Sequence, residues 1–164
     1  MDITTWIRWI LIIGLIYSKF KSMLYLMKRT IKGDYQFGRK YETIVMNYLN
    51  EKFNKSYQLN PERYGSYDFF NDKDHCELKT RKCTHNRYNT TIFGATKVDK
   101  MDKEKNNIFY FLFTDGLYRW LYNEKECFTD TNGRVDRGRP EFAQHINIPI
   151  EHLELVTEEL SSSS

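Results

Sequence analysis

The sequence predicts a single mixed α/β domain built around one central sheet, and three observations lead to that prediction. Apolar residues recur at helical spacing from Tyr41 to Phe53. Two strand-like segments flank the turn-forming stretch 71–74, and a continuous apolar run from Ile108 to Thr114 ends at Asp115-Gly116. Because helical and strand patterns alternate along the chain, helices packed on a mixed sheet are the expected architecture.

The composition is that of a folded domain of modest size. A chain of 164 residues suffices for one hydrophobic core, and 40% hydrophobic with 29% charged residues argue against disorder. The net charge of +3 permits a polyanionic partner without requiring one. The three cysteines form no CxxC pair, which favours a reducing, intracellular compartment, cytoplasmic or nuclear. The spacing of His75, Cys76, Cys83 and His85 matches no common zinc module.

Residues 1–27 form a hydrophobic N-terminal segment that is expected to be helical. The uncharged stretch Trp9 to Tyr17 is shorter than the ~20 residues that cross a bilayer. Three interpretations stay open: an interfacial or short membrane anchor that acts through residues 6–26, a helix packed on the domain or on a partner, and an upstream extension before a start at Met23 or Met27. The remainder divides into a domain over 28–160 and a flexible tail over 161–164.

The first half of the domain contains a helix followed by a hairpin. The apolar stripe predicts a helix from Tyr41 to about Asn54, and Lys55 to Asn60 is compatible with a short strand closed by Pro61. Ser66–Phe70 and His75–Arg81 are predicted to be strands, because the residues between them form turns or carry charge.

The second half is predicted to contain a helix from about Phe93 to Lys105 and then a buried strand, Ile108–Thr114. Asp115-Gly116 is a strong hairpin signal, with Leu117–Tyr122 as the return strand. Asn123–Ala143 is rich in turn formers. His145–Ile150 is predicted to be the last strand and Glu151–Leu160 a short terminal helix.

The first hairpin carries the residues that suggest chemistry. If its strands pair symmetrically about Asp72 and Lys73, Asp68 lies opposite Glu77 with Cβ atoms ~4.5–5.5 Å apart. Lys79 lies two residues further along, so it shares that face. The opposite face is largely apolar and is expected to belong to the core.

Two carboxylates held this close repel each other unless a proton or a cation lies between them. A hard divalent ion with oxygen ligands, Mg²⁺ or Mn²⁺, suits such a pair and would promote phosphoryl chemistry. Lys79 could orient a water or stabilise developing negative charge. Glu42, beside the apolar stripe of the preceding helix, is a further acid able to reach this edge of the sheet.

Gly38-Arg39-Lys40-Tyr41-Glu42, then Asp68, then Glu77-Leu78-Lys79 resembles the PD-(D/E)xK nuclease superfamily, which includes restriction endonucleases and Holliday junction resolvases. The resemblance covers roughly residues 33–122. It implies a restriction-endonuclease-like core, with a central mixed sheet flanked by helices, and Mg²⁺-dependent hydrolysis of nucleic acid. Tyr67 stands where the family often has proline, and Thr43 where resolvase-like members often have arginine.

The resemblance also implies roles for individual residues. Asp68, Glu77 and the Leu78 carbonyl would be metal ligands, Lys79 the catalytic lysine and Glu42 an accessory acid. Lys97 is the candidate for the basic residue that the family's second core helix directs toward the site. The residues expected to contact phosphates are Arg81, Lys82, Arg87, Lys97, Lys100, Arg134, Arg137 and Arg139.

The sequence thus predicts a metal-dependent DNA endonuclease. Two alternatives remain: a nucleic-acid-binding domain of the same fold without activity, and a membrane-anchored interaction protein. The sequence does not distinguish DNA from RNA, branched from double-stranded substrates, or internal from terminal cuts. Many members of the resembled family pair to cut two strands, so a homodimer is compatible with this interpretation.

Overall fold

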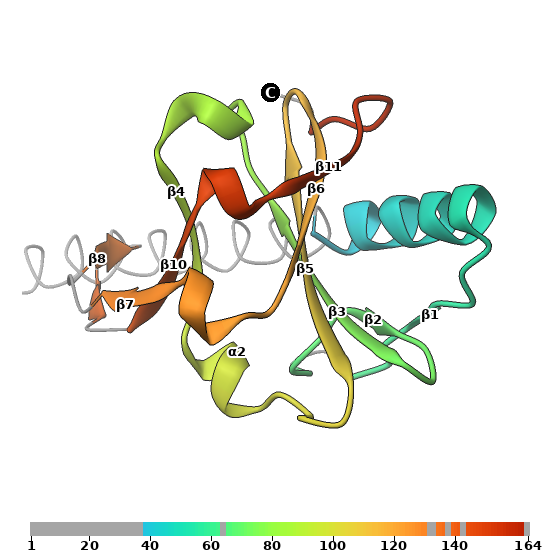
Figure 1. Cartoon of the computed structure of the whole chain (residues 1–164), viewed down its shortest axis with the longest axis horizontal. Coiled ribbons are helices and arrows are strands. Elements are labelled where there is room, and N and C mark those ends of the chain that lie inside the picture. The colour runs from blue at the N-terminus through green and yellow to red at the C-terminus, as the bar shows by residue number, and fades with distance from the viewer. Residues whose placement is uncertain (1–37, 63–64, 131–133, 137–138, 142–143, 163–164) are drawn as a thin grey trace, which may run out of the picture. The chain divides into compact units, whose positions relative to one another are not determined.

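The computed structural model describes residues 38–62, 65–130, 134–136, 139–141 and 144–162 (Figure 1). The chain divides into two units, Met1–Lys40 and Tyr41–Ser164, and the predicted site lies in the second. The N-terminal segment 1–27 lies outside the described residues. Within the described ranges, no helix is both long enough and apolar enough to cross a membrane.

A helix over residues 38–53 opens the described part, in agreement with the predicted helix. The elements that follow it are β1 (Gln58–Leu59), β2 (Phe69–Phe70), β3 (Asp74–Thr80), η1 (His85–Arg87), β4 (Thr90–Gly94), α2 (Thr96–Asp99), β5 (Asn106–Phe113), β6 (Gly116–Leu121), η2 (Glu124–Glu126), β7 (Phe128–Asp130), β8 (Arg134–Asp136), β9 (Arg139–Glu141), β10 (His145–Pro149), η3 (Ile150–His152) and β11 (Glu154–Thr157).

The largest sheet has the strand order β1-β2-β3-β5-β6-β11. Strands β3 and β5 run parallel, whereas the other neighbouring pairs are antiparallel. The prediction of an α/β domain with a mixed central sheet is therefore confirmed. The predicted β5–β6 hairpin is confirmed too, with Phe113 paired to Gly116 at its tight end.

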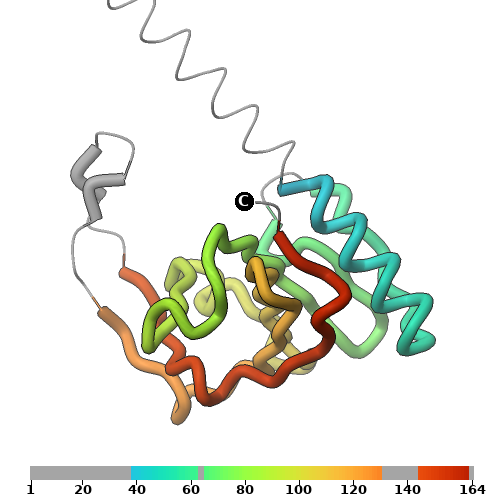
Figure 2. The backbone as a smooth tube through the Cα atoms, turned by 90° about the horizontal axis from the view of Figure 1, so that it is seen from above, coloured from blue at the N-terminus to red at the C-terminus, as the bar shows by residue number. Residues whose placement is uncertain are grey.

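The helix over 38–53 covers one face of this sheet (Figure 2). Its apolar stripe places Val45 and Leu49 in the core, at 0% and 3% exposure. Leu49 lines a small cavity together with Tyr110 of β5, and the ring of Tyr110 in turn lies 5.8 Å from that of Phe69 in β2. The spacing recognised in the sequence is thus the spacing of the helix–sheet contact.

A second sheet of three strands, in the order β4-β10-β7, covers the other face. Phe93 of β4 stacks on Phe109 of β5 with ring centroids 4.0 Å apart, and Trp120 and Ile148 are buried in the same cluster. The sheet flanked by helices that the resemblance implies is not found on this side. Here strands close the core, and in the described residues after 53 the only α-helix is the short α2, beside the 3₁₀ turns η1, η2 and η3.

Two predicted helices are wrong. The segment predicted as a helix from Phe93 to Lys105 begins in strand β4, and only α2 within it is helical. Residues 90–94 pair with β10 along the full length of both strands, so long-range pairing overrides local helical preference. The predicted terminal helix, Glu151–Leu160, is instead the 3₁₀ turn η3 followed by β11, which pairs with β6.

Candidate active site

The hairpin formed by β2 and β3 has the predicted register. Phe69 pairs with Cys76 and Phe70 with His75, as symmetrical pairing about the turn requires. The side chain of Asn71 closes the turn, because its Oδ1 accepts the backbone N–H groups of Lys73 and Asp74 at 2.9 and 2.8 Å. Phe69, Phe70 and the paired residues of β3 therefore have the predicted register. Tyr67, expected on the apolar face, is an exception, because its ring stacks on His75 with centroids 4.0 Å apart.

The side chains on the two faces of β3 lie in different surroundings. Cys76 is fully buried on the side of the helix, together with Phe69. Glu77 and Lys79 point to the other side, because they are in parallel register with Phe109 and Phe111 of the core between the sheets. Glu77 and Lys79 thus lie where the two sheets meet, whereas Asp74 is on the helix side and accepts the Tyr57 hydroxyl.

Asp68 lies immediately before β2, where regular strand pairing stops. Its backbone N–H donates to the Cys76 carbonyl at 2.8 Å, and its Oδ2 accepts the backbone N–H of Leu78 at 2.7 Å. The carboxylate therefore takes the position along β3 that a further strand residue would fill. The Leu78 carbonyl points toward the same edge, because the N–H and C=O of one strand residue face the same neighbour.

Glu77 is the most enclosed acid of the site, with 4% exposure. Its Oε1 lies 2.5 Å from Nζ of Lys79, and its Oε2 lies 2.8 Å from Nζ of Lys97 in α2. Lys97 also donates to the Gly65 carbonyl at 3.0 Å, so it joins β3 to the segment that leads into Asp68. Two ammonium groups thus neutralise one buried carboxylate, as a buried charge requires.

The pKa of Asp68 is raised to about 7. Burial is the largest cause, followed by the negative charges of Glu77 and Glu42. The Leu78 amide and the charge of Lys79 act in the opposite direction without reversing the shift. The helix residue Glu42 therefore contributes to the electrostatics of this site, and three acids act on one another there.

The donor set fits a hard divalent cation. Asp68 and Glu77 supply carboxylate oxygens, and the Leu78 carbonyl faces the same edge. Burial and, after it, repulsion from Glu77 and Glu42 raise the pKa of Asp68, and a cation would offset both effects. Among the described residues, no group of three or more His, Cys, Asp or Glu side chains lies close enough together to hold a metal on its own. A metal here would accordingly need the backbone carbonyl and water or substrate oxygens as well.

The basic residues predicted to contact phosphates lie in different places. Lys97 is in the site itself, through its ion pair with Glu77. Arg81 donates to the Ile92 carbonyl and to Thr91 Oγ1 and so joins the end of β3 to β4. Lys82, Arg87 and Lys100 are exposed. The backbones of Arg134 and Arg139 belong to the paired strands β8 and β9, but their side chains and all of Arg137 lie outside the described residues.

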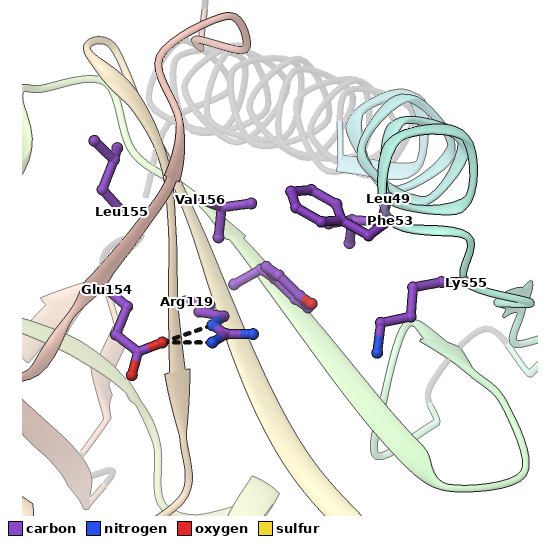
Figure 3. Close-up of a pocket in the computed structure, with 8 residues that line it drawn as sticks. Leu49, Phe53, Lys55, Arg119, Glu154, Leu155 and Val156 are labelled. Atoms are coloured by element: carbon purple, nitrogen blue, oxygen red, sulfur yellow. Dashed lines mark hydrogen bonds and ion pairs between the residues drawn. The ribbon is translucent and has the colours of Figure 1, made fainter.

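One cavity lies away from these residues, between the end of the helix and β11 (Figure 3). It has a volume of about 200 Å³, and its walls are mostly apolar, with Leu49, Phe53 and Val156 among them. Figure 3 shows Lys55 at its rim and an exposed ion pair in which Arg119 Nη2 lies 2.7 Å from Glu154 Oε2. This cavity does not include any of Asp68, Glu77 and Lys79.

A larger groove of about 540 Å³ begins at Lys79 and extends between β4 and the segment 81–88. His85 and Tyr88 line it, and neither was assigned a role from the sequence. His85 belongs to a basic cluster in the sequence that is a local signal for the groove and consists of Lys79, Arg81, Lys82, His85 and Arg87. The opposite wall comes from β4, about ten residues further along, and no short motif could indicate that.

The chain matches no protein family model, and no curated protein or solved structure is significantly similar to it. The chemistry of the site therefore has to be inferred from its own residues, together with the short motif that resembles the PD-(D/E)xK pattern.

Proposed function

We propose that this protein is a Mg²⁺-dependent nuclease that hydrolyses phosphodiester bonds, acting as a DNA endonuclease. The observation that carries the proposal is the buried Glu77 carboxylate, which is held by Lys79 and Lys97 beside Asp68. A purely structural ion pair needs one cation for one acid. Here two lysines and two further acids gather at an open strand edge, an arrangement suited to holding a metal and a phosphate.

Each residue of the proposed site has its own role in catalysis. Asp68, Glu77 and the Leu78 carbonyl would hold the ion, which supplies Lewis-acid polarisation of the phosphate and a more acidic water. Lys79 places a positive charge where negative charge develops on the phosphate during attack. Lys97 holds the Glu77 carboxylate in position through Oε2, and Glu42 adds negative charge that favours cation binding.

The resemblance to the PD-(D/E)xK nucleases supports the same function. The hairpin with Asp68, Glu77 and Lys79, the preceding helix with Glu42, and a basic residue reaching the site from α2 are what that resemblance implies. A restriction-endonuclease-like core is part of this proposal. The three-stranded sheet over the second face is a departure from a core flanked by helices.

Plasmid cleavage by the purified full-length chain tests the proposal. Supercoiled DNA, linear duplex, branched DNA and RNA are incubated with Mg²⁺, with Mn²⁺ or with a chelator. We expect metal-dependent nicking or linearisation of the plasmid, because internal cuts convert the supercoiled form. Binding of DNA without cleavage at any metal concentration would instead identify an inactive nucleic-acid-binding domain.

Variants with nearly unchanged shape locate the activity. Asp68→Asn, Glu77→Gln and Lys79→Met are each expected to lower the cleavage rate by more than about a hundredfold, because each removes a charge that acts on the metal or the phosphate. The matched control is Asp72→Asn, an exposed carboxylate in the turn of the same hairpin. Full activity in any of the three variants, with circular dichroism showing a folded protein, would remove that residue from the site.

A further inference from the structure

The groove that begins at Lys79 shares this residue with the proposed active site. Lys79 contacts Glu77 on one side and lines the groove on the other. From there the groove passes Thr84, His85 and Tyr88, with β4 forming the opposite wall. A polymer bound along it would therefore end at the residues proposed to cleave a phosphodiester bond.

The charge of the groove suits a polyanion. The described side chains that line it include Lys79, Arg81, His85 and His145, and there is no aspartate or glutamate among these described residues. The Arg81 guanidinium is held in place by the Ile92 carbonyl and lies 5.8 Å from the centre of the Phe111 ring. Its charge is thus fixed in the wall, where it attracts phosphates without needing to be ordered first.

His85 is held in one orientation. Its Nδ1 lies 2.7 Å from Asp115 Oδ2, its backbone N–H donates to Asp115 Oδ1 at 2.9 Å, and its ring stacks on Tyr118 with centroids 4.6 Å apart. Because Asp115 engages Nδ1, Nε2 is the ring nitrogen left to meet a ligand. In this orientation the ring presents Nε2 to a ligand in the groove.

Tyr88 provides a surface for a base. Its side chain is 64% exposed, and the Arg87 guanidinium lies 6.0 Å from the centre of its ring. An exposed aromatic ring beside a cationic groove is the combination that holds unpaired bases, which stack on the ring while the backbone follows the charges. In a duplex the bases are already stacked on each other and could not use it.

We propose that this groove binds a single unpaired nucleic-acid strand, which runs from the phosphate at Lys79 past His85 to a base stacked on Tyr88. The inference rests on the proposed nuclease function and names its substrate class: DNA with an unpaired segment. The groove volume of about 540 Å³ is within the range of roughly 300–1,000 Å³ found for small-ligand pockets, which suits one or two nucleotides and not a duplex.

Fluorescence anisotropy of a labelled oligothymidylate tests the proposal with the full-length chain in chelator, where cleavage cannot interfere. A blunt duplex of the same length is measured in parallel. Tyr88→Ala and His85→Ala are each expected to weaken binding of the single strand by about tenfold, as expected for the loss of one stacked base or one phosphate contact. Tyr88→Phe is expected to bind as the wild type does, because it keeps the ring.

Phe53→Ala is the matched control, since Phe53 is also an exposed aromatic residue, at 48%, and lines the separate small cavity. Single-strand binding that is unchanged in Tyr88→Ala and His85→Ala would overturn the groove proposal, and so would equal weakening of duplex binding. Metal-dependent cleavage by the wild type in the same preparation would leave the nuclease function standing in that case. If the two variants bind the single strand selectively more weakly but the wild type never cleaves, the groove proposal stands and the nuclease proposal is overturned.

Discussion

Glu77 is buried by the core, and its charge is tolerated only because two lysines reach it. Lys79 comes from the same strand, whereas Lys97 comes from α2, twenty residues further along the chain. Removing one partner of a buried carboxylate leaves it without full compensation, which costs more than the original pair contributes. Lys97 is therefore expected to matter for both stability and activity.

Lys97→Met tests this expectation directly. The variant is expected to lower the free energy of unfolding by about 1–3 kcal/mol, because Glu77 keeps Lys79 but loses its second cation. Its cleavage rate should also fall, since the carboxylate is no longer held at Oε2. Urea denaturation and plasmid cleavage measure the two effects. Lys100→Met, an exposed lysine at the end of the same helical turn, is the control, and equal losses in both variants would contradict the special role of Lys97.

Asp68 gives the site a pH dependence whose sign follows from its pKa. The folded protein holds this proton up to about pH 7, whereas the unfolded chain releases it near 3.8. Between these values the folded state binds more protons than the unfolded state, so the contribution of Asp68 to stability falls as pH rises from about 4 to about 7. Above about pH 7 the folded protein carries the full free-energy cost of ionising the buried Asp68 carboxylate.

Asp68→Asn removes this penalty while keeping an oxygen that can accept the Leu78 N–H. In chelator, the variant is expected to melt several degrees above the wild type near pH 8.5 and to lose most of this advantage near pH 4.5, because the raised pKa corresponds to a penalty of up to about 4 kcal/mol. Scanning calorimetry at the two pH values measures it. An advantage that is independent of pH would show that the ionisation of Asp68 is not its cause.

These residues differ in how far local sequence could reveal them. Asp68, Glu77 and Lys79 were predictable because a short symmetrical turn fixes the register, and register determines which side chains share a face. Lys97 was expected to face the site only through the family resemblance, and its helix proved to be four residues long instead of thirteen. The role of His85 depends on Asp115, thirty residues away, and no periodic pattern encodes that contact.

The β5–β6 hairpin is the element on which the core between the sheets depends. Its tight end requires Gly116, which has φ of +152°, a conformation that side chains rarely adopt. A Cβ there would also lie 2.8 Å from the Thr157 carbonyl of β11. The Asp-Gly signal was therefore readable from sequence, whereas the contact with β11 that makes glycine necessary was not.

Gly116→Ala is expected to destabilise the protein by at least about 2 kcal/mol, because it combines backbone strain with a steric clash. Chemical denaturation measures the change. Gly94→Ala is the control, since a Cβ at Gly94 would meet only the Thr96 hydroxyl at an ordinary 3.7 Å. Similar stability for the two variants would contradict the account of the turn.

The two wrong helix predictions have a common cause. Strand β4 pairs with β10, and β11 pairs with β6, each with partners more than thirty residues away. Residues 151–160 contain several glutamates and leucines, which favour helices locally, but sheet pairing decides their conformation. Long-range partners of this kind leave no trace in local periodicity.

At the scale of the whole molecule, the site lies where the two sheets and α2 meet. Glu77 faces the covered side of the large sheet, and Lys97 reaches it from the segment that follows β4. A cation held by Asp68, Glu77 and the Leu78 carbonyl would add contacts that exist only in the folded state. Its effect should thus appear in the stability of the entire domain, because a ligand that binds only the folded state stabilises it.

Mg²⁺ is accordingly expected to raise the melting temperature of the wild type at neutral pH, by an amount that corresponds to about 1.4 kcal/mol at a tenfold excess over its dissociation constant. Differential scanning fluorimetry against NaCl of equal ionic strength measures it. Glu77→Gln should show no such rise. A rise of the same size in Glu77→Gln would indicate that Mg²⁺ binds elsewhere.

The carboxylate of Asp68 has one further consequence. By accepting the Leu78 N–H, it occupies an edge of β3 that β2 leaves after only two residue pairs. An uncovered strand edge is a template for adding a strand from another molecule, and an inward charge is a common protection against such aggregation. Truncation of Asp68 to alanine should therefore favour self-association as well as inactivity. The acid proposed for chemistry is thus also expected to reduce association between copies of the chain.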